Sequence, residues 1–150
     1  MLGSWLSGPQ SVAEAAGIDV GYPGKRLGLP EQGPNSVASM GRRFAATLID
    51  WLLAEAIIYG AMPSATNSER QFPILGVFAL INIAMVTTLG AGIGGLVLRE
   101  RVARLDGANP SLISALMRTV LLVLVIPALF IDRDYRGWHD RYAGTIVVMR

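Results

Sequence analysis

The chain has 150 residues, of which 52% are hydrophobic and 16% charged, and its mean hydropathy is +0.46. Soluble domains carry about 25% charged residues, so this composition favours one compact unit in a lipid bilayer. The absence of cysteine excludes disulfides and thiolate metal sites, and a net charge of +2 is too small to indicate a nucleic-acid partner.

Residues 1–40 contain many Gly and Pro residues, which interrupt any long helix. We expect a flexible cytoplasmic tail here. The alternative is an arm that docks a partner through Trp5, Tyr22, Lys25 and Arg26. Neither a basic segment nor an apolar run follows Met1, so no cleavable signal peptide is predicted.

The first predicted membrane helix covers residues 43–60, and the rest of the chain is organised around it. Residues 44–59 contain neither Gly nor Pro and carry only two charges, Asp50 and Glu55. This run covers about 24 Å, close to the ~30 Å of a hydrocarbon core. Asp50 therefore lies inside the membrane, where an ionised carboxylate costs roughly 2.5–3.5 kcal/mol. Glu55 is rotated by about 140° from Asp50 and points elsewhere.

Two interpretations of Asp50 stay open. It is either a structural group that hydrogen-bonds another helix or pairs with an arginine, or a carboxylate that binds a proton or cation. The second predicted helix, residues 72–92, begins a run that has no charge as far as residue 98. Asn82 lies near the middle of this run and is a candidate hydrogen-bond partner for Asp50.

Glycines at residues 90, 92, 94 and 95 formally match a dinucleotide-binding pattern. We reject that function because the stretch follows an apolar span and no acidic partner stands about twenty residues on. Close backbone packing or the exit of a helix explains these glycines better. The loop that follows, residues 96–110, is basic through three arginines.

The third predicted helix, residues 111–131, is apolar apart from Ser114, Arg118 and Thr119, and Pro127 would kink it. It could span the membrane, dip in and return, or lie in the interface. The loop between the first two helices holds a single basic residue, Arg70, so the positive-inside rule places the N-terminal segment in the cytoplasm. Charge favours a cytoplasmic C-terminus as well, although length permits a third span.

Two motifs then suggest a family. Residues 43–50, RFAATLID, resemble the Arg-x-x-Ala-x-x-Ile-Asp signature of the RDD family of small membrane proteins, and residues 134–148 are similar to its closing motif. The resemblance covers about 41–150. It implies a membrane fold of largely undefined role, with cation/proton exchange proposed for some members, and it assigns the naming residues to Arg43, Asp50 and Asp140.

The resemblance extends to the central loop and to Arg118 in the following helix. One departure is that Gly94 and Gly95 stand where the family has Gly-Lys, so no role of that lysine carries over. We expect Arg43 and Asp140 to form an ion pair that ties the C-terminal motif to the first helix, with Asp50 deeper and within reach of Arg118.

The sequence therefore predicts an all-α integral membrane protein. We expect a small helical bundle of two full spans plus the third kinked apolar helix, with a short cytoplasmic strand pair that would include residues 143–150. Residues 1–40 would form the tail and 41–150 the membrane domain, of which 132–150 is the C-terminal motif. We place the protein in the plasma membrane with a cytoplasmic N-terminus. The candidate polar residues are Arg43, Asp50, Asp140, Arg118, Asn82 and Glu55.

The most economical function is an accessory or scaffold membrane protein that presents a basic cytoplasmic face to a protein partner or to anionic lipid. The alternative is a proton-coupled cation transporter that uses Asp50; two or three spans cannot enclose a pathway, so it requires an oligomer. His139 is the only histidine and no nucleophile stands in a catalytic setting, so we predict no enzyme, metal site or cofactor. The expected partners are membrane lipid, a protein partner or further copies of the chain, and no nucleic acid.

Overall fold

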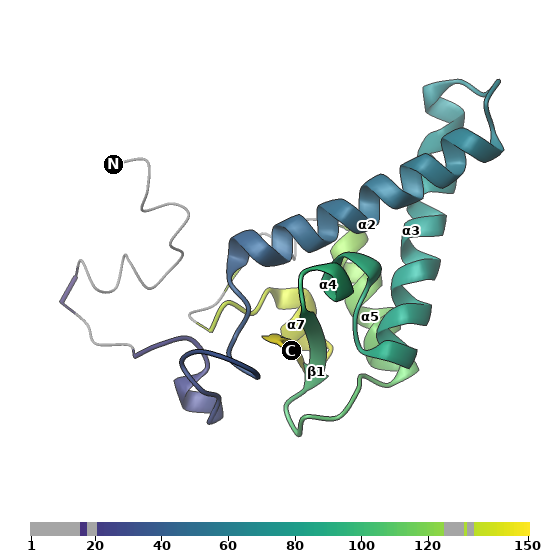
Figure 1. The fold of residues 1–150 in the computed structure, drawn as a ribbon. Coiled ribbons are helices and arrows are strands. Elements are labelled where there is room, and N and C mark those ends of the chain that lie inside the picture. Colours follow the sequence, from purple (N-terminus) through teal and green to yellow (C-terminus); the bar gives the residue numbers. More distant parts are fainter. Residues whose placement is uncertain (1–15, 18–20, 125–130, 132–133) are drawn as a thin grey trace.

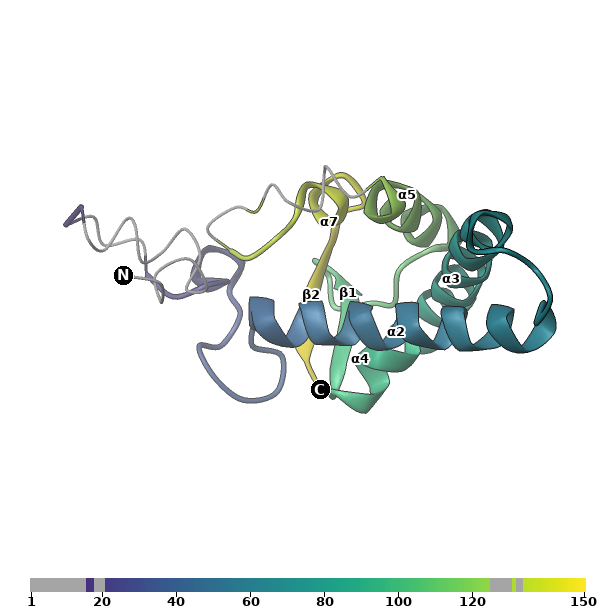
Figure 2. The same ribbon diagram turned by 90° about the horizontal axis from the view of Figure 1, so that it is seen from above.

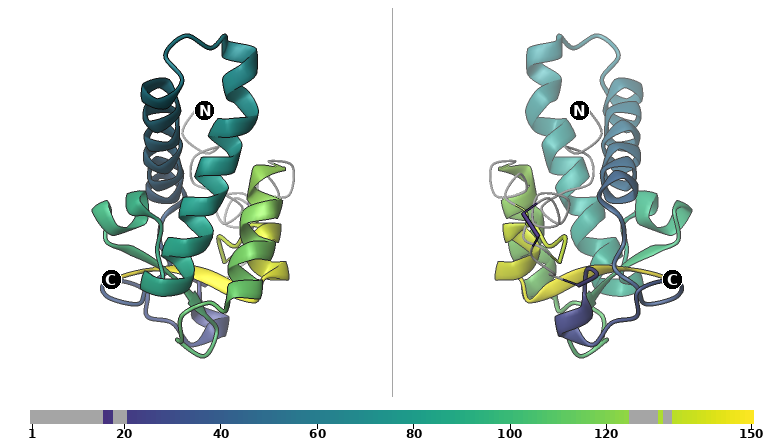
Figure 3. Two further views of the ribbon diagram at one scale, coloured as in Figure 1. Left: turned by 90° about the vertical axis from the view of Figure 1, so that its right-hand side faces the viewer. Right: turned by 90° about the vertical axis from the view of Figure 1, so that its left-hand side faces the viewer.

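The computed structural model describes residues 16–17, 21–124, 131 and 134–150. Two long helices, α2 (Met40–Ala61) and α3 (Asn67–Leu89), form a hairpin (Figure 1). A two-stranded sheet and several shorter elements lie at the end of the hairpin where α2 begins and α3 ends (Figure 3). The shorter elements are η1 (Lys25–Leu27), α4 (Ile93–Val97), α5 (Leu112–Val123) and α7 (Trp138–Tyr142), and the strands are β1 (Glu100–Arg104) and β2 (Thr145–Met149).

Within the described residues, α2 and α3 are the helices that are long and apolar enough to cross a membrane. Their 22 and 23 residues correspond to lengths of about 33–35 Å. In each helix, only 22% of an apolar 18-residue stretch is buried inside the structure, so the pair is not the core of a soluble domain. Phe44 and Phe72 are 71% and 80% exposed, a surface that suits lipid better than water.

The helix boundaries differ from the predicted ranges of 43–60 and 72–92 because the termini have their own chemistry. At the start of α3, the Thr66 backbone N–H donates to Glu69, and the two residues form a capping box that begins the helix at Asn67. At its end, Gly90 adopts a left-handed conformation with φ of 72°, which closes the helix at Leu89.

The sheet was predicted only as an optional strand pair, and it is formed. β1 and β2 pair antiparallel, with Val102 opposite Val147. The strand β1 lies inside the stretch that we predicted as a basic loop, residues 96–110. Both faces of this strand are covered: Val102 lies in the core with Ala38, Val86, Ala115 and Val147, and Ala103 packs with Ile146 and Val148.

The described part of the third apolar segment is too short to cross a membrane. Helix α5 has 12 residues and is about 18 Å long, against the ~30 Å that a span needs. It lies beside the half of α3 nearest the sheet (Figure 3), and residues 125–130 lie outside the described part of the chain. Ile131 then pairs with Gly137, and α7 and β2 return to the sheet. This return contradicts a full third crossing and leaves the other two alternatives.

Residues 21–39 belong to the stretch that was predicted as a flexible tail, and several of them pack against the sheet. Val37 pairs with Val148, and the Ala38 backbone N–H donates to the Val147 carbonyl at 3.0 Å. The exposed Arg26 pairs with Asp134 at 3.1 Å and so links η1 to the C-terminal motif. The aromatic residue Trp5 of the alternative docking arm lies outside the described residues.

The glycine-rich stretch brings α4 against α2, as Figure 2 shows from above. A Cβ atom at Gly94 would overlap the backbone carbonyl of Ala46, and one at Gly92 would overlap Asp50. Both glycines therefore allow a backbone approach that no other residue permits. The predicted role of this stretch, close packing after a helix exit, agrees with this arrangement.

Substituting Gly94 tests the packing of α4 on α2. Gly94→Ala should lower the free energy of unfolding by about 1–3 kcal/mol or more, because its methyl group has no room. Gly76→Ala is the matched control: no atom lies within 4 Å of its added Cβ, and alanine favours a helix by about 0.5–1 kcal/mol. Thermal unfolding in one detergent compares the two variants. Equal melting temperatures would contradict the close approach.

Candidate functional site: a buried arginine–aspartate cluster and its cavity

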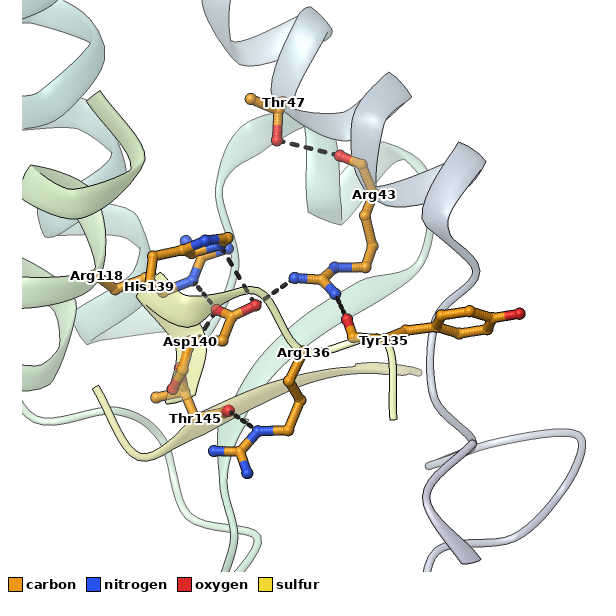
Figure 4. Close-up of polar contacts among 8 residues, drawn as sticks. All are labelled: Arg43, Thr47, Arg118, Tyr135, Arg136, His139, Asp140 and Thr145. Atoms are coloured by element: carbon orange, nitrogen blue, oxygen red, sulfur yellow. Dashed lines mark hydrogen bonds and ion pairs between the residues drawn. The ribbon is translucent and has the colours of Figure 1, made fainter. Parts of the chain in front are cut away.

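Asp140 is fully buried and joins three parts of the chain. Its Oδ1 accepts a hydrogen bond from Arg118 Nε at 2.7 Å, and its Oδ2 accepts one from Arg43. His139 Nε2 lies 3.3 Å from the same Oδ2, and Thr145 Oγ1 donates to Oδ1 at 3.4 Å. We call these five residues the Asp140 cluster; Figure 4 shows their arrangement.

The cluster is held together by charge in a dry environment. The side chains of Arg43 and Arg118 are each only 10% exposed. Burial alone would raise the pKa of Asp140, but the two guanidinium charges outweigh it and hold that pKa well below its usual value. The carboxylate is therefore ionised at any physiological pH, and it compensates two cations at once.

The predicted ion pair between Arg43 and Asp140 is present but is not an isolated pair. Arg43 divides its donors between Asp140 and the backbone carbonyl of Tyr135, so one guanidinium binds two points of the C-terminal motif. Arg118 was expected to reach Asp50. It bonds to Asp140 instead, and its charge acts on Asp50 only through space.

Asp50 occupies a second site, on the α2 face that meets α4. The backbone N–H of Gly94 donates to its Oδ1 at 2.8 Å, and Asn82 also interacts with the carboxylate. The structure thus brings Asn82 to Asp50 as predicted, while the main donor is a backbone group. Glu55 is not part of this site: it accepts a hydrogen bond from Trp51 Nε1 at 3.3 Å.

A cavity of about 490 Å³ lies between the two sites. It is lined by α2, α3, α4, α5, β1 and α7 and includes Arg43, Asp50, Arg118 and His139 among its polar residues. Its volume falls in the ~300–1,000 Å³ range of small-molecule sites. We call it the interhelical cavity.

Glu100 is the polar residue of this cavity that the sequence did not single out. It is 3% exposed, and its Oε1 is buried without a hydrogen-bond partner in the described structure. Burial raises its pKa to about 7, against the opposing charges of Arg43, Arg42 and Arg118. Because the folded pKa exceeds the unfolded one, the fold favours the protonated form. Ionisation as the pH rises from about 4.5 to 7 therefore lowers the free energy of unfolding.

The sequence treated Glu100 as one charge of a basic loop. The signal that could have found it is strand alternation, since Glu100 lies two residues before the core residue Val102. His139, the single histidine of the sequence, belongs to the Asp140 cluster. It is buried, and burial lowers its pKa to about 4, so it is neutral at physiological pH, with Nε2 3.3 Å from Asp140 Oδ2. Among the described residues no group of three His, Cys, Asp or Glu is placed to hold a metal ion.

The family comparison agrees with the resemblance seen in the sequence. The model of the RDD family matches residues 37–144, a stretch that contains the first motif and residues 134–144 of the second, and the chain therefore belongs to the RDD family, a family of membrane proteins. No curated protein and no solved structure matches the chain.

Removing the charge of Asp140 tests the cluster. Asp140→Asn should lower the free energy of unfolding by about 3–5 kcal/mol, because it leaves two buried guanidinium groups without their shared anion. The control is Asp106→Asn, which affects an exposed pair with Arg104 at 3.5 Å and should change stability by less than about 0.5 kcal/mol. Chemical unfolding in detergent measures both. A loss of the same size in the two variants would show that the cluster contributes no more than a surface pair.

Proposed function

We propose that this member of the RDD family is an accessory or scaffold protein of the plasma membrane that presents a basic cytoplasmic face to anionic lipid or to a protein partner. The observation that carries the proposal is the distribution of exposed charge between the two ends of the helix hairpin. We assign the sheet end to the cytoplasm because the positively charged end of a membrane protein stays inside.

The exposed cations gather around the sheet and the first turn of α2. They are Lys25, Arg26, Arg42, Arg99, Arg104, Arg141 and Arg150. Each basic residue near an anionic bilayer contributes about 1 kcal/mol of attraction. Together with the exposed apolar faces of α2, α3 and α5, this arrangement supports a protein that sits in the membrane with its basic face at the headgroups.

The opposite end of the hairpin offers no comparable surface in the described residues. Its arginine, Arg70, is buried and donates to the carbonyls of Met62 and Pro63, both at 2.8 Å from Nη2. The guanidinium also lies 4.3 Å from the ring centroid of Tyr59. This cation closes the loop between α2 and α3 and is not available to a partner.

The second candidate, a proton-coupled cation transporter, is favoured by one observation: Asp50 is an intramembrane carboxylate beside the interhelical cavity. Against it, the Asp50 carboxylate already accepts the Gly94 N–H and interacts with Asn82, which suits a structural role. Two crossing helices and the short α5 would also require further copies of the chain to enclose a pathway.

Reconstituted vesicles separate the two functions. A scaffold should produce no pH-driven cation flux above that of protein-free vesicles, either as the wild type or as Asp50→Asn, because no pathway crosses a single copy. A pH-sensitive dye inside vesicles with an imposed sodium or potassium gradient measures the flux. Wild-type flux that disappears in a folded Asp50→Asn protein would favour the transporter.

The same preparations test the basic face directly. The combined variant Arg42→Gln, Arg104→Gln and Arg141→Gln should lose most of the anionic lipid that co-purifies with the wild type. Replacing the exposed Glu31 by Gln is the charge-neutralising control and should not reduce the amount of bound lipid. Equal lipid retention by the triple variant and the wild type would contradict the proposed role of the face.

A further inference from the structure

The interhelical cavity has an apolar wall and a polar end. The wall includes Phe44, Leu75, Phe78, Leu122 and Val123, which come from α2, α3 and α5. The polar end includes Glu100, Asp50 and Asn82. This combination, a largely apolar enclosure with a few converging polar groups, is typical of sites for small molecules.

The polar groups of the cavity are not equally available. Arg43 and Arg118 already bond to Asp140, and Arg43 also bonds to the Tyr135 carbonyl. Glu100, in contrast, has a buried oxygen without a partner in the described structure. An unsatisfied buried acceptor costs about 1–3 kcal/mol, and more when it is charged. A ligand that donates to Glu100 would recover this cost.

We propose that the interhelical cavity binds a small amphipathic amine, with its ammonium group at Glu100 and its alkyl chain along the wall of Phe44, Leu75 and Phe78. The proposal concerns the interior of the domain and does not rest on the basic face. Phe44 lines the cavity and is 71% exposed on α2, one of the helices that are long and apolar enough to cross a membrane.

The hydrogen bonds around the cavity favour a cationic head over an anionic one. The three arginines that line the cavity already donate elsewhere: Arg43 and Arg118 to Asp140, and Arg101 to Asn35 and the Gly107 carbonyl. An anionic head would have to displace one of these acceptors, whereas an ammonium group needs only the free oxygen of Glu100.

The pH dependence of binding identifies the responsible carboxylate. The charged and titratable groups that line the cavity or act on Glu100 are Arg42, Arg43 and Asp50 of α2, Arg101 of β1, Arg118 of α5, and His139 of α7, with Asp140 beside them. Arginine stays charged, and His139 is neutral above pH 5.5 because its pKa is lowered to about 4.

Glu100 therefore titrates near neutral pH, since burial raises its pKa to about 7. An alkylammonium ion, with a pKa near that of lysine at about 10.4, keeps its charge across this range. The ligand binds the ionised carboxylate, so at lower pH it must displace a proton. The dissociation constant should rise about tenfold for each pH unit below 7 and stay constant between pH 7.5 and 9.

Trp51 lines the cavity and serves as the reporter. In a Trp5→Phe, Trp138→Phe background, which leaves Trp51 as the single tryptophan, the full chain is placed in nanodiscs of zwitterionic lipid. The probes are 11-bromoundecylamine, 11-bromoundecanoate and 11-bromoundecanol, whose bromine quenches tryptophan on contact. We expect saturable quenching by the amine that excess undecylamine reverses, and only weak linear quenching by the acid and the alcohol.

Glu100→Gln should weaken binding of the amine at least tenfold and remove the pH dependence of its affinity. Asp50→Asn should keep that pH dependence. Glu31→Gln, an exposed control of the same chemistry, should bind within twofold of the parent protein. If Glu100→Gln does not fold, the pH dependence of amine binding to the parent protein is the deciding measurement. Equal linear quenching by all three probes, tighter binding of the acid, or an amine affinity that is independent of pH between 5.5 and 7 would overturn the proposal.

Discussion

The fold depends on one buried carboxylate shared by two arginines. Asp140 belongs to the C-terminal motif, Arg43 to the start of α2 and Arg118 to α5, so a single fully buried group ties three distant segments together. Two guanidinium groups held in a dry environment require an anion, and removing it is far more costly than removing a surface pair. The position of the C-terminal motif, and the return of the chain after α5, follow from this requirement.

The shape of the membrane domain is consistent with that constraint. Helix α2 and helix α3 supply the length to cross a bilayer, while α5 covers only part of that distance and leads back toward α7 and β2. The sheet pairs β1, which follows α3 and α4, with β2 at the end of the chain. The result is an apolar hairpin that carries a small polar layer at one end.

The two acids beside the cavity show how differently a carboxylate can be accommodated. Asp50 is stabilised by the Gly94 N–H, and that contact is possible because glycines let α4 approach the α2 backbone. Glu100 has a buried oxygen without such a donor in the described structure, and its pKa is raised to about 7. The three residues that the resemblance assigns as naming residues thus divide into two groups: Arg43 and Asp140 hold the C-terminal motif, and Asp50 fixes the glycine-rich turn.

Sequence reasoning reached the parts of this structure that depend on local pattern. Apolar length predicted α2 and α3, the RDD motifs predicted the approach of Arg43 to Asp140, and helix depth suggested Asn82 as a neighbour of Asp50. Sequence reasoning failed where a tertiary contact decides how residues are arranged. The partner of Arg118 depends on the return of the C-terminal motif, the packing of residues 21–39 depends on a sheet that neither segment forms alone, and the burial of Glu100 depends on what covers β1. In the sequence, a charge-rich loop and a partly buried strand have the same pattern, and only the elements packed against them distinguish the two.

We expect the Asp140 cluster to hold the C-terminal motif on the same side of the membrane as the loop after β1, opposite the loop between α2 and α3. The chain contains no cysteine, so single cysteines at the exposed positions Ser64, Ala108 and Arg141 can be labelled with a membrane-impermeant maleimide in intact cells. Ser64→Cys should be labelled from outside, and Ala108→Cys and Arg141→Cys should react only after permeabilisation. Labelling of Arg141→Cys together with Ser64→Cys in intact cells would show that the C-terminal motif lies on the side of the hairpin loop.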